Sequence, residues 1–202
     1  MLRVALTGGI ATGKSYVLAR LKERGIPTID ADDIVHEALG PATATTRTIA
    51  TQLGSAFLKP DGSIDRNLVA AKVFAEPETR RQLEAIVHPV VYDAISTWFG
   101  ALDRAMGVAS IPLLYETGRE RDFDFVAVTV CRPEVQLQRL IERDRMPEEK
   151  ARQRLAAQMP AEAKAALGHF VIRTEGSMVA TDRQIEELHK ALDRVTYGSS
   201  GS

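Results

Sequence analysis

The chain has 202 residues, of which 45% are hydrophobic and 26% charged. This is the composition of a globular protein with one sizeable core, which excludes a disordered chain and a coiled coil. The 26 basic and 27 acidic side chains give a net charge of -1, so no overall positive field exists to hold nucleic acid or an anionic membrane. Any anion that the chain binds must therefore be held locally.

Cysteine content and hydropathy indicate the cellular setting. The single cysteine, Cys131, cannot form an internal disulfide, and no apolar run reaches the roughly 18 to 20 residues that span a bilayer. The chain opens on a strand-like run rather than on a basic segment with a cleavage site. We therefore expect a cytoplasmic protein with no nucleic acid, membrane or obligate protein partner, and a flexible tail over residues 196–202.

The first forty residues alternate between strand and helix patterns. Residues 2–7 form a β-compatible run that ends at two glycines, and residues 14–24 then show helical spacing of apolar side chains. A second strand-like run covers residues 26–29, and the acidic stretch 30–33 lies at its carboxyl end. Open α/β sheets bind their ligands at that end of the strands.

The rest of the chain continues this pattern around a helical interruption. Continuous apolar runs predict buried parallel strands at 108–114 and 125–130, with a weaker strand at 169–172. Residues 39–107 lack convincing strands and show a long helical spacing that Pro89 should break or kink near His88. Further helices are expected at residues 134–143, 148–158 and 178–195. The last of these carries an apolar face that should cover one side of the sheet, formed by Ile185, Leu188, Leu192 and Val195.

A phosphate-binding motif follows the first predicted strand. Residues 8–15, GGIATGKS, match G-x-x-x-x-G-K-[ST], in which backbone N–H groups and a helix N-terminus surround a phosphate of ATP or GTP. Glycines permit the backbone angles that the curled loop requires, the lysine adds a positive charge and the serine supplies a hydroxyl for Mg²⁺. Tyr16 either lies over nucleotide atoms or faces solvent. The predicted nucleotide-binding positions are Ala11, Thr12, Gly13, Lys14, Ser15 and Tyr16.

These patterns predict an α/β fold of the P-loop kinase type. Its doubly wound, mostly parallel five-stranded sheet would carry a helical substrate-binding insertion and a helical lid. We expect one domain over residues 1–202, in which the core comprises about 1–38, 107–143 and 166–195. The insertion would cover about 39–106 and the lid about 144–165.

A kinase that phosphorylates an alcohol needs a base near the acceptor oxygen, and one carboxylate suffices. Asp30, Asp32 and Asp33 are the candidates. On an extended stretch Asp30 and Asp32 point to the same face, so Asp33 is the residue expected to be solvated or to cap the next helix. Helix capping is the alternative role for each of the three.

Several motifs in order resemble those of dephospho-CoA kinases over nearly the whole chain: LTGGIATGKS, IDAD, DGSIDR, IVHP, PLLYE, and RLIERD with R-x-x-x-Q after it. The resemblance implies Mg²⁺-dependent transfer of the ATP γ-phosphoryl to the ribose 3′-hydroxyl of dephospho-CoA, which gives coenzyme A and ADP. Another P-loop nucleoside or small-alcohol kinase is one alternative. A nucleotide-switch protein is another, although the base-specificity motif N-K-x-D does not occur.

The resemblance also assigns roles to residues. It implies that Asp32 is the catalytic base and that Lys14 and the lid residue Arg143 act on the phosphates. The implied acceptor-binding positions are Asp32, Arg66, His88, Leu113, Leu114 and Glu116. By residue type alone, the histidine reads as a structural side chain and the glutamate as a charge at a strand end.

The predicted lid is rich in arginine, with six arginines and five acids over residues 132–154. A salt-bridged, solvated pair of helices accounts for most of them. Arg143 is the exception because it closes one helix just before a short hinge, and its planar guanidinium can bind phosphate oxygens bidentately.

The chain departs from the family pattern in three places. In the phosphate loop Ala11 and Thr12 replace glycine and serine, and Tyr16 stands where a small hydroxyl residue is usual. HFVIRTEGS, residues 169–177, replaces ADFVIDNSGS, so that His169, Arg173 and Thr174 stand for two acids and an asparagine.

Overall fold

The computed structural model describes residues 1–198 and divides into two compact units. One unit comprises Met1–Ile29 and the chain from Leu102 onward, and the other comprises Asp30–Ala101. The last part of the predicted tail, residues 199–202, lies outside the described residues. Helix α9 continues to Tyr197, two residues further into that tail than predicted.

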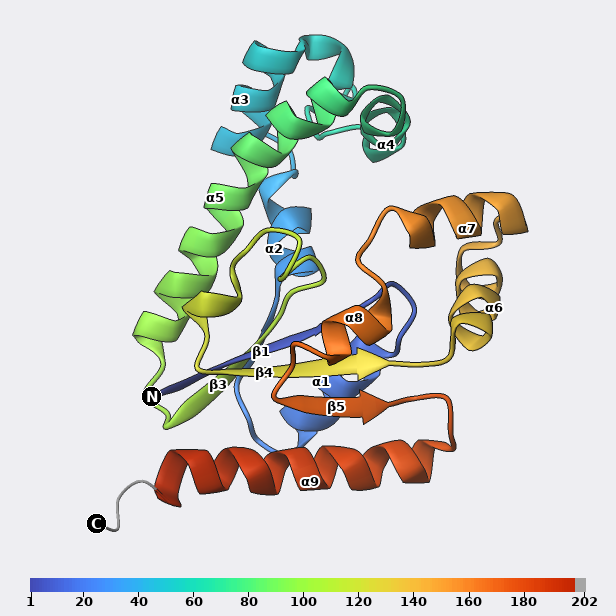
Figure 1. Ribbon diagram of the computed structural model, residues 1–202. Helices are drawn as coiled ribbons and strands as arrows, with labels where there is room; N and C mark the ends of the chain where they lie inside the picture. Colours follow the sequence, from blue (N-terminus) through green and yellow to red (C-terminus); the bar gives the residue numbers. More distant parts are fainter. Residues whose placement is uncertain (199–202) are drawn as a thin grey trace. The chain divides into compact units, whose positions relative to one another are not determined.

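A five-stranded parallel sheet with the strand order β2-β3-β1-β4-β5 organises the fold (Figure 1). This confirms the predicted fold class. β3 is buried along its whole length and β4 along nearly all of it, as their continuous apolar sequences require. The strands are β1 Leu2–Gly8, β2 Thr28–Asp30, β3 Met106–Ser110, β4 Phe125–Val130 and β5 Phe170–Arg173.

The third strand is shorter than the apolar run that predicted it. β3 ends at Ser110, and the chain then turns, with backbone hydrogen bonds from Thr117 N to Leu113 O and from Arg119 N to Leu114 O, both 3.1 Å long. Proline has no N–H with which to extend a ladder, so Pro112 ends the strand pattern. The segment 112–116 consequently lies beyond the carboxyl end of β3.

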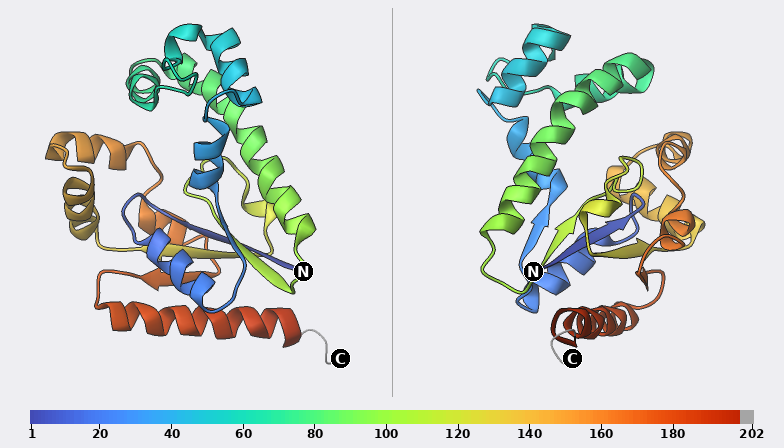
Figure 2. Two further views of the ribbon diagram at one scale, coloured as in Figure 1. Left: turned by 180° about the vertical axis from the view of Figure 1, so that it is seen from behind. Right: turned by 60° about the vertical axis from the view of Figure 1, so that its left-hand side comes forward.

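Helices cover both faces of the sheet in this unit (Figure 2). α1 Lys14–Glu23 and α9 Met178–Tyr197 lie on one face, where α1 packs on β1 and β3 and α9 packs on β5. The short helix α8 Ala161–Ala165 lies on the other face, over β4 and β1. Two further helices, α6 Pro133–Asp144 and α7 Glu148–Ala156, pack on each other, and α7 lies within the predicted lid. A 3₁₀ turn covers Glu120–Asp122.

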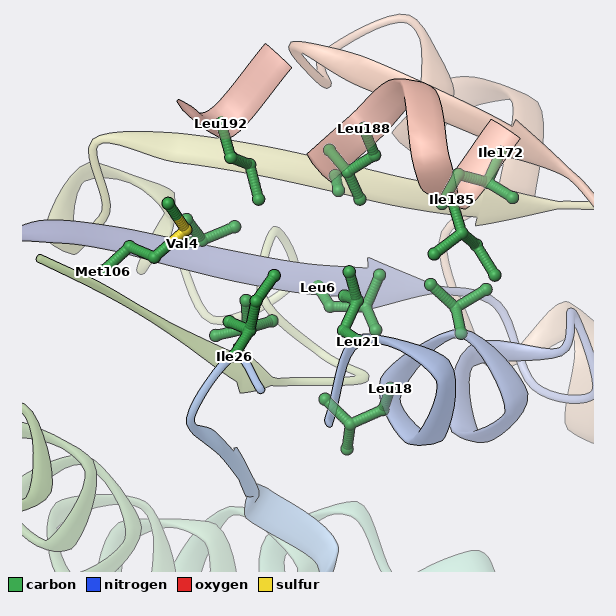
Figure 3. Close-up of a cluster of buried hydrophobic side chains, with 13 residues drawn as sticks. Val4, Leu6, Leu18, Leu21, Ile26, Met106, Ile172, Ile185, Leu188 and Leu192 are labelled. Carbon is green, nitrogen blue, oxygen red and sulfur yellow. The ribbon is translucent and has the colours of Figure 1, made fainter. Parts of the chain in front are cut away.

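The hydrophobic core of this unit lies between the sheet and the α1–α9 layer (Figure 3). Ile185, Leu188 and Leu192 of α9 are fully buried there, which confirms the apolar face predicted for this helix. Val195, predicted on the same face, is 43% exposed because it lies in the last turn, near the end of the sheet. Burial of these side chains is the main force that holds α9 on the sheet.

The unit Asp30–Ala101 is helical. Its elements are α2 Ala31–Ala38, α3 Ala44–Leu53, a 3₁₀ turn Ser55–Phe57, α4 Arg66–Ala75 and α5 Pro77–Ala101. α5 packs on α2, α3 and α4, and it runs through Pro89 without a break, so a break at this proline is wrong and a kink there stays a prediction. Val87, Val91 and Ile95 lie one turn apart on a buried face, and their packing offsets the hydrogen bond that proline removes.

Within residues 1–198, no helix has both the length and the apolar character needed to cross a membrane.

Candidate active site

The loop between β1 and α1 has the geometry of an anion site. Gly13 lies at φ +85° and precedes α1, whose first turn contains no acidic residue and whose N-terminus has no side-chain cap. The first N–H groups of a helix lack intrahelical partners, so here they can bind a phosphate. Gly8 is required because of space rather than backbone angle: a Cβ atom there would lie 2.2 Å from Thr129 Oγ1 and 2.6 Å from Thr129 O.

Two residues in the middle of the loop are set by its conformation. Thr12 is fully buried, its hydroxyl donates to Gly9 O over 2.7 Å and it shares a 2.8 Å hydrogen bond with Thr129 Oγ1. Ala11 lies at φ +60°, in the left-handed region that costs a residue with a β-carbon roughly 1–2 kcal/mol. The loop therefore keeps a glycine-like conformation at a position that carries a methyl group.

Lys14 and Ser15 begin helix α1. Lys14 Nζ donates to Ser110 Oγ over 2.6 Å, which holds the ammonium group at the carboxyl end of β3. Ser15 is exposed at the start of the helix. Sequence reasoning missed Ser110; its only signal is a hydroxyl residue inside an apolar strand run.

Two glutamine side chains hold the phosphate loop from outside. The backbone N–H of Ile10 donates to Gln158 Oε1 over 3.0 Å, and Gln136 Nε2 donates to Ile10 O over 2.7 Å. Gln136 belongs to α6 and Gln158 follows α7, so both ends of the segment that contains these two helices are bonded to one residue of the loop. Gln158 is the glutamine of the R-x-x-x-Q motif, whereas nothing in the sequence marked Gln136.

Tyr16 connects α1 to α9. Its hydroxyl donates to Asp182 Oδ1 over 2.8 Å, and Arg20 donates to both oxygens of the same carboxylate over 2.9 and 3.0 Å. The hydrogen bonds from Arg20 and then Tyr16 lower the pKa of Asp182, and the bond to Asp182 raises the pKa of Tyr16. The hydroxyl thus has a structural partner that the sequence did not suggest, and a nucleotide contact of this residue stays a prediction.

The segment that departs from the family pattern packs on the phosphate loop. Thr174 Oγ1 donates to Thr12 O over 2.8 Å, and Arg139 donates to Thr174 Oγ1 and Thr174 O over 2.9 and 2.6 Å. Cys131 is buried, and burial raises the pKa of its thiol. His169 Nδ1 accepts a 2.9 Å hydrogen bond from Val126 N. These substituted residues therefore join β5 to its neighbours.

Arg143 lies at the end of α6, where Arg145 leaves the helix at φ +49°. Its Nε donates to Asp144 Oδ1 over 2.7 Å, and Arg154 of α7 donates to Asp144 Oδ2 over 2.9 Å. The hydrogen bond from Arg143 is the first cause of the lowered pKa of Asp144. The Arg143 side chain is 55% exposed, so solvent screening weakens this ion pair.

The predicted base, Asp32, lies in the helical unit. Asp30 Oδ1 accepts a 3.0 Å hydrogen bond from Asp32 N, so Asp30 is the residue of the three that caps α2. Asp33 is exposed, so the first of its two expected roles, solvation, is the one that the structure shows. The extended stretch is shorter than assumed, because α2 begins at Ala31. Asp32 and Asp33 both fall in the first helical turn, where carboxylates interact favourably with the helix dipole.

The other two predicted acceptor-binding residues of this unit lie on different helices. Arg66 begins α4 and its Nη2 donates to His36 O over 3.2 Å, which links it to α2, the helix that carries Asp32. His88 lies on α5, in an edge-to-face contact with Tyr92 at 6.5 Å between ring centroids.

The acceptor positions after β3 have a clear local structure. Leu114 is fully buried and Leu113 partly so. Glu116 Oε1 accepts from Met159 N over 3.0 Å and pairs with Lys164 Nζ at 2.8 Å. Lys164 is fully buried, and sequence reasoning missed it because an isolated lysine in a short helix gives no signal.

A sequence model of the dephospho-CoA kinase family matches residues 2–180. The chain belongs to the dephospho-CoA kinase family. It is 41% identical over 198 residues to the dephospho-CoA kinase of Anaeromyxobacter dehalogenans, which covers 95% of this chain and 94% of that relative. This membership decides among the kinase and switch alternatives, and the chain is an ATP-dependent phosphotransferase that acts on dephospho-CoA.

Two solved structures share the fold over nearly their whole length. The dephospho-CoA kinase of Campylobacter jejuni is 26% identical with a TM-score of 0.70, and the match covers 98% of each chain. A protein of Thermus thermophilus is 28% identical with a TM-score of 0.81, and the match covers 95% of this chain and 97% of that one.

Proposed function

We propose that the chain transfers the γ-phosphoryl of ATP specifically to the 3′-hydroxyl of the ribose of dephospho-CoA, with Asp32 as the base. The uncapped N-terminus of α1 beside Lys14 carries this proposal, because it supplies oriented N–H groups and a positive charge for the phosphates of ATP. In the reaction we assign the loop residues 11–16 to the nucleotide and residues 113, 114 and 116 to the acceptor. The setting we propose is the cytoplasm, where Cys131 stays a buried thiol.

The residues present fit a nucleotide-borne Mg²⁺. Mg²⁺ prefers hard oxygen ligands and usually binds through one or two protein oxygens together with phosphates and water. Ser15 offers an exposed hydroxyl at the start of α1, next to Lys14, and would hold the ion. When bound there, Mg²⁺ neutralises charge on the phosphate oxygens.

Each group in the transfer has a defined role. The acceptor oxygen forms a bond to the γ-phosphorus while the bond from that phosphorus to the β–γ bridging oxygen breaks, and ADP leaves. The proton of the acceptor hydroxyl passes to the carboxylate of Asp32. Lys14 and Arg143 stabilise the charge that spreads over the transferred group. Arg66 and His88 bind the acceptor on the helical unit.

Replacement of Asp32 by asparagine tests this assignment. Asparagine keeps the shape of the side chain and removes the base, so we expect Asp32→Asn to bind ATP and dephospho-CoA about as well as the parent and to lose roughly 10²- to 10⁴-fold in kcat. Single-turnover phosphoryl transfer and calorimetric binding of each substrate measure the two effects. Product analysis by NMR identifies the phosphorylated hydroxyl.

Asp30→Asn and Asp33→Asn are matched controls from the same stretch. Asparagine is as good an N-cap as aspartate, so Asp30→Asn should keep the fold and most of the turnover. If Asp32→Asn turned over normally while one of these variants was inactive, the base would be assigned to the wrong position. If all three variants stayed active, the carboxylate-base mechanism would be wrong.

A further inference from the structure

Lys164 is a charged side chain with no solvent exposure. A buried ammonium group is costly unless ion pairs and hydrogen bonds compensate for the lost water. Here Nζ donates to Pro112 O over 2.7 Å and pairs with Glu116 Oε1 at 2.8 Å. A methionine would fill a similar volume without this cost, so the charge at this position needs an explanation.

The two partners of Lys164 lie at the two ends of one short segment. Pro112 and Glu116 bracket residues 113–115, so a single ammonium group joins both ends of the turn after β3. Thr7 Oγ1 of β1 also donates to Pro112 O, over 3.4 Å. The conformation of the segment therefore depends on a side chain that lies about fifty positions later in the sequence.

Glu116 extends this link to the lid. The same Oε1 atom accepts from Met159 N over 3.0 Å, and the preceding residue, Gln158, accepts from Ile10 N of the phosphate loop. Residues 158–164 thus contact the phosphate loop at one end and the segment 112–116 at the other. α8, which carries Lys164, packs on β4 and β1, and this packing fixes the position of the Lys164 backbone relative to the sheet.

We propose that Lys164 is a positioning residue for the acceptor. It fixes the conformation of the segment 112–116, and through Glu116 it keeps that segment in contact with Met159, which follows α7. The inference rests on the proposed assignment of residues 113, 114 and 116 to dephospho-CoA. It follows that two residues of the segment 158–164 have separate roles: Lys164 supports acceptor binding, and Gln158 supports the phosphate loop.

Lys164→Met tests the proposal through the separation of two Michaelis constants. Misplacement of a binding segment by about 1 Å can cost on the order of 10²-fold. We therefore expect the KM for dephospho-CoA to rise about 10- to 100-fold, while the KM for ATP stays close to that of the parent. Gln158→Ala should show the opposite pattern, with the larger change in the KM for ATP.

Glu162→Gln is the matched control because it alters a charged residue of the same helix that pairs with Arg173 at 2.8 Å in an exposed ion pair. Both Michaelis constants should be unchanged in this variant. If Lys164→Met lowered the melting temperature and left both constants unchanged, or raised both equally, Lys164 would be a purely structural residue and the proposal would be wrong.

A second variant keeps the test decisive if Lys164→Met does not fold. Lys164→Met with Glu116→Gln removes both charges of the pair, so no unpaired carboxylate remains. We expect this double variant to fold. Because Glu116 is itself assigned to the acceptor, Glu116→Gln alone is its reference, and the KM for dephospho-CoA should be higher in the double variant than in that reference; an equal value would overturn the proposal. If the parent enzyme phosphorylated no dephospho-CoA, the proposed function itself would be wrong. The assignment of the acceptor segment, on which this inference rests, would then be wrong as well.

Discussion

Ala11 lies in a backbone conformation that suits glycine, at φ +60° within the phosphate loop. The loop is fixed in this shape by its neighbours, since the buried hydroxyl of Thr12 bonds to Gly9 O and to Thr129. The backbone at Ala11 therefore cannot move to a φ that suits its methyl group, and the strain persists in the folded state.

Replacement of this alanine by glycine should relieve the strain. We expect Ala11→Gly to raise the free energy of unfolding by about 1 kcal/mol, because the left-handed conformation costs a β-carbon more than glycine loses in chain entropy. Urea unfolding measures the change. Ala19→Gly, at an exposed interior position of α1, is the control and should lower stability by about 0.5–1 kcal/mol. A loss of similar size in Ala11→Gly would contradict the argument.

At the scale of elements, α1 and α9 are joined by Asp182 with Tyr16 and Arg20. Because these hydrogen bonds lower the pKa of the folded carboxyl, they stabilise the fold above the unfolded value of about 3.9, and this contribution is lost as the pH falls through the folded pKa. The link should therefore weaken only in acid.

Asp182→Asn tests this pH dependence. The variant should be less stable than the parent at pH 7, and the difference should shrink as the pH falls from about 4 through the lowered pKa of the folded carboxyl. Unfolding curves at pH 7, 5 and 3 measure it. Glu187→Gln, at an exposed position of the same helix, is the control and should give a stability difference that changes less with pH. A constant difference for Asp182→Asn would show that its charge is not involved.

At the scale of the whole molecule, the proposed function assigns the phosphates to two distant parts of the chain, the loop at Lys14 and the predicted lid at Arg143. We expect Lys14→Ala to lose on the order of 10²- to 10³-fold in kcat. For Arg143→Ala the loss should be about 10³- to 10⁵-fold, as for other arginines directed at a γ-phosphate. Both variants should melt near the parent temperature, because neither side chain is part of the core. Turnover beside thermal melting tests this.

Arg152→Ala is the control for the lid, since that arginine forms an exposed ion pair with Glu148. It should turn over normally. Near-normal kcat in Arg143→Ala would transfer the lid role to Arg139 or Arg145. Of these, Arg139 already donates two hydrogen bonds to Thr174, and Arg145 ends α6 in a left-handed conformation.

The sequence alone determined the sheet, the phosphate loop and the family. Local signals carry these features: continuous apolar runs predict buried parallel strands, and the glycines with Lys14 and Ser15 fix a loop whose geometry depends on adjacent residues. The apolar face of α9 was equally predictable, because side chains three and four apart lie on one side of a helix.

Only the tertiary structure decided which side chains support the site. The sequence left open which of Asp30, Asp32 and Asp33 caps α2, because a propensity does not state where a strand ends. It also allowed a break at Pro89 that α5 does not have, because the packing that a helix gains is not visible in the sequence. Lys164 and Ser110 were missed for a related reason. Their roles arise from contacts with residues far away in the chain, Glu116 and Lys14, and such contacts exist only when the folded backbone brings the partners within hydrogen-bond distance.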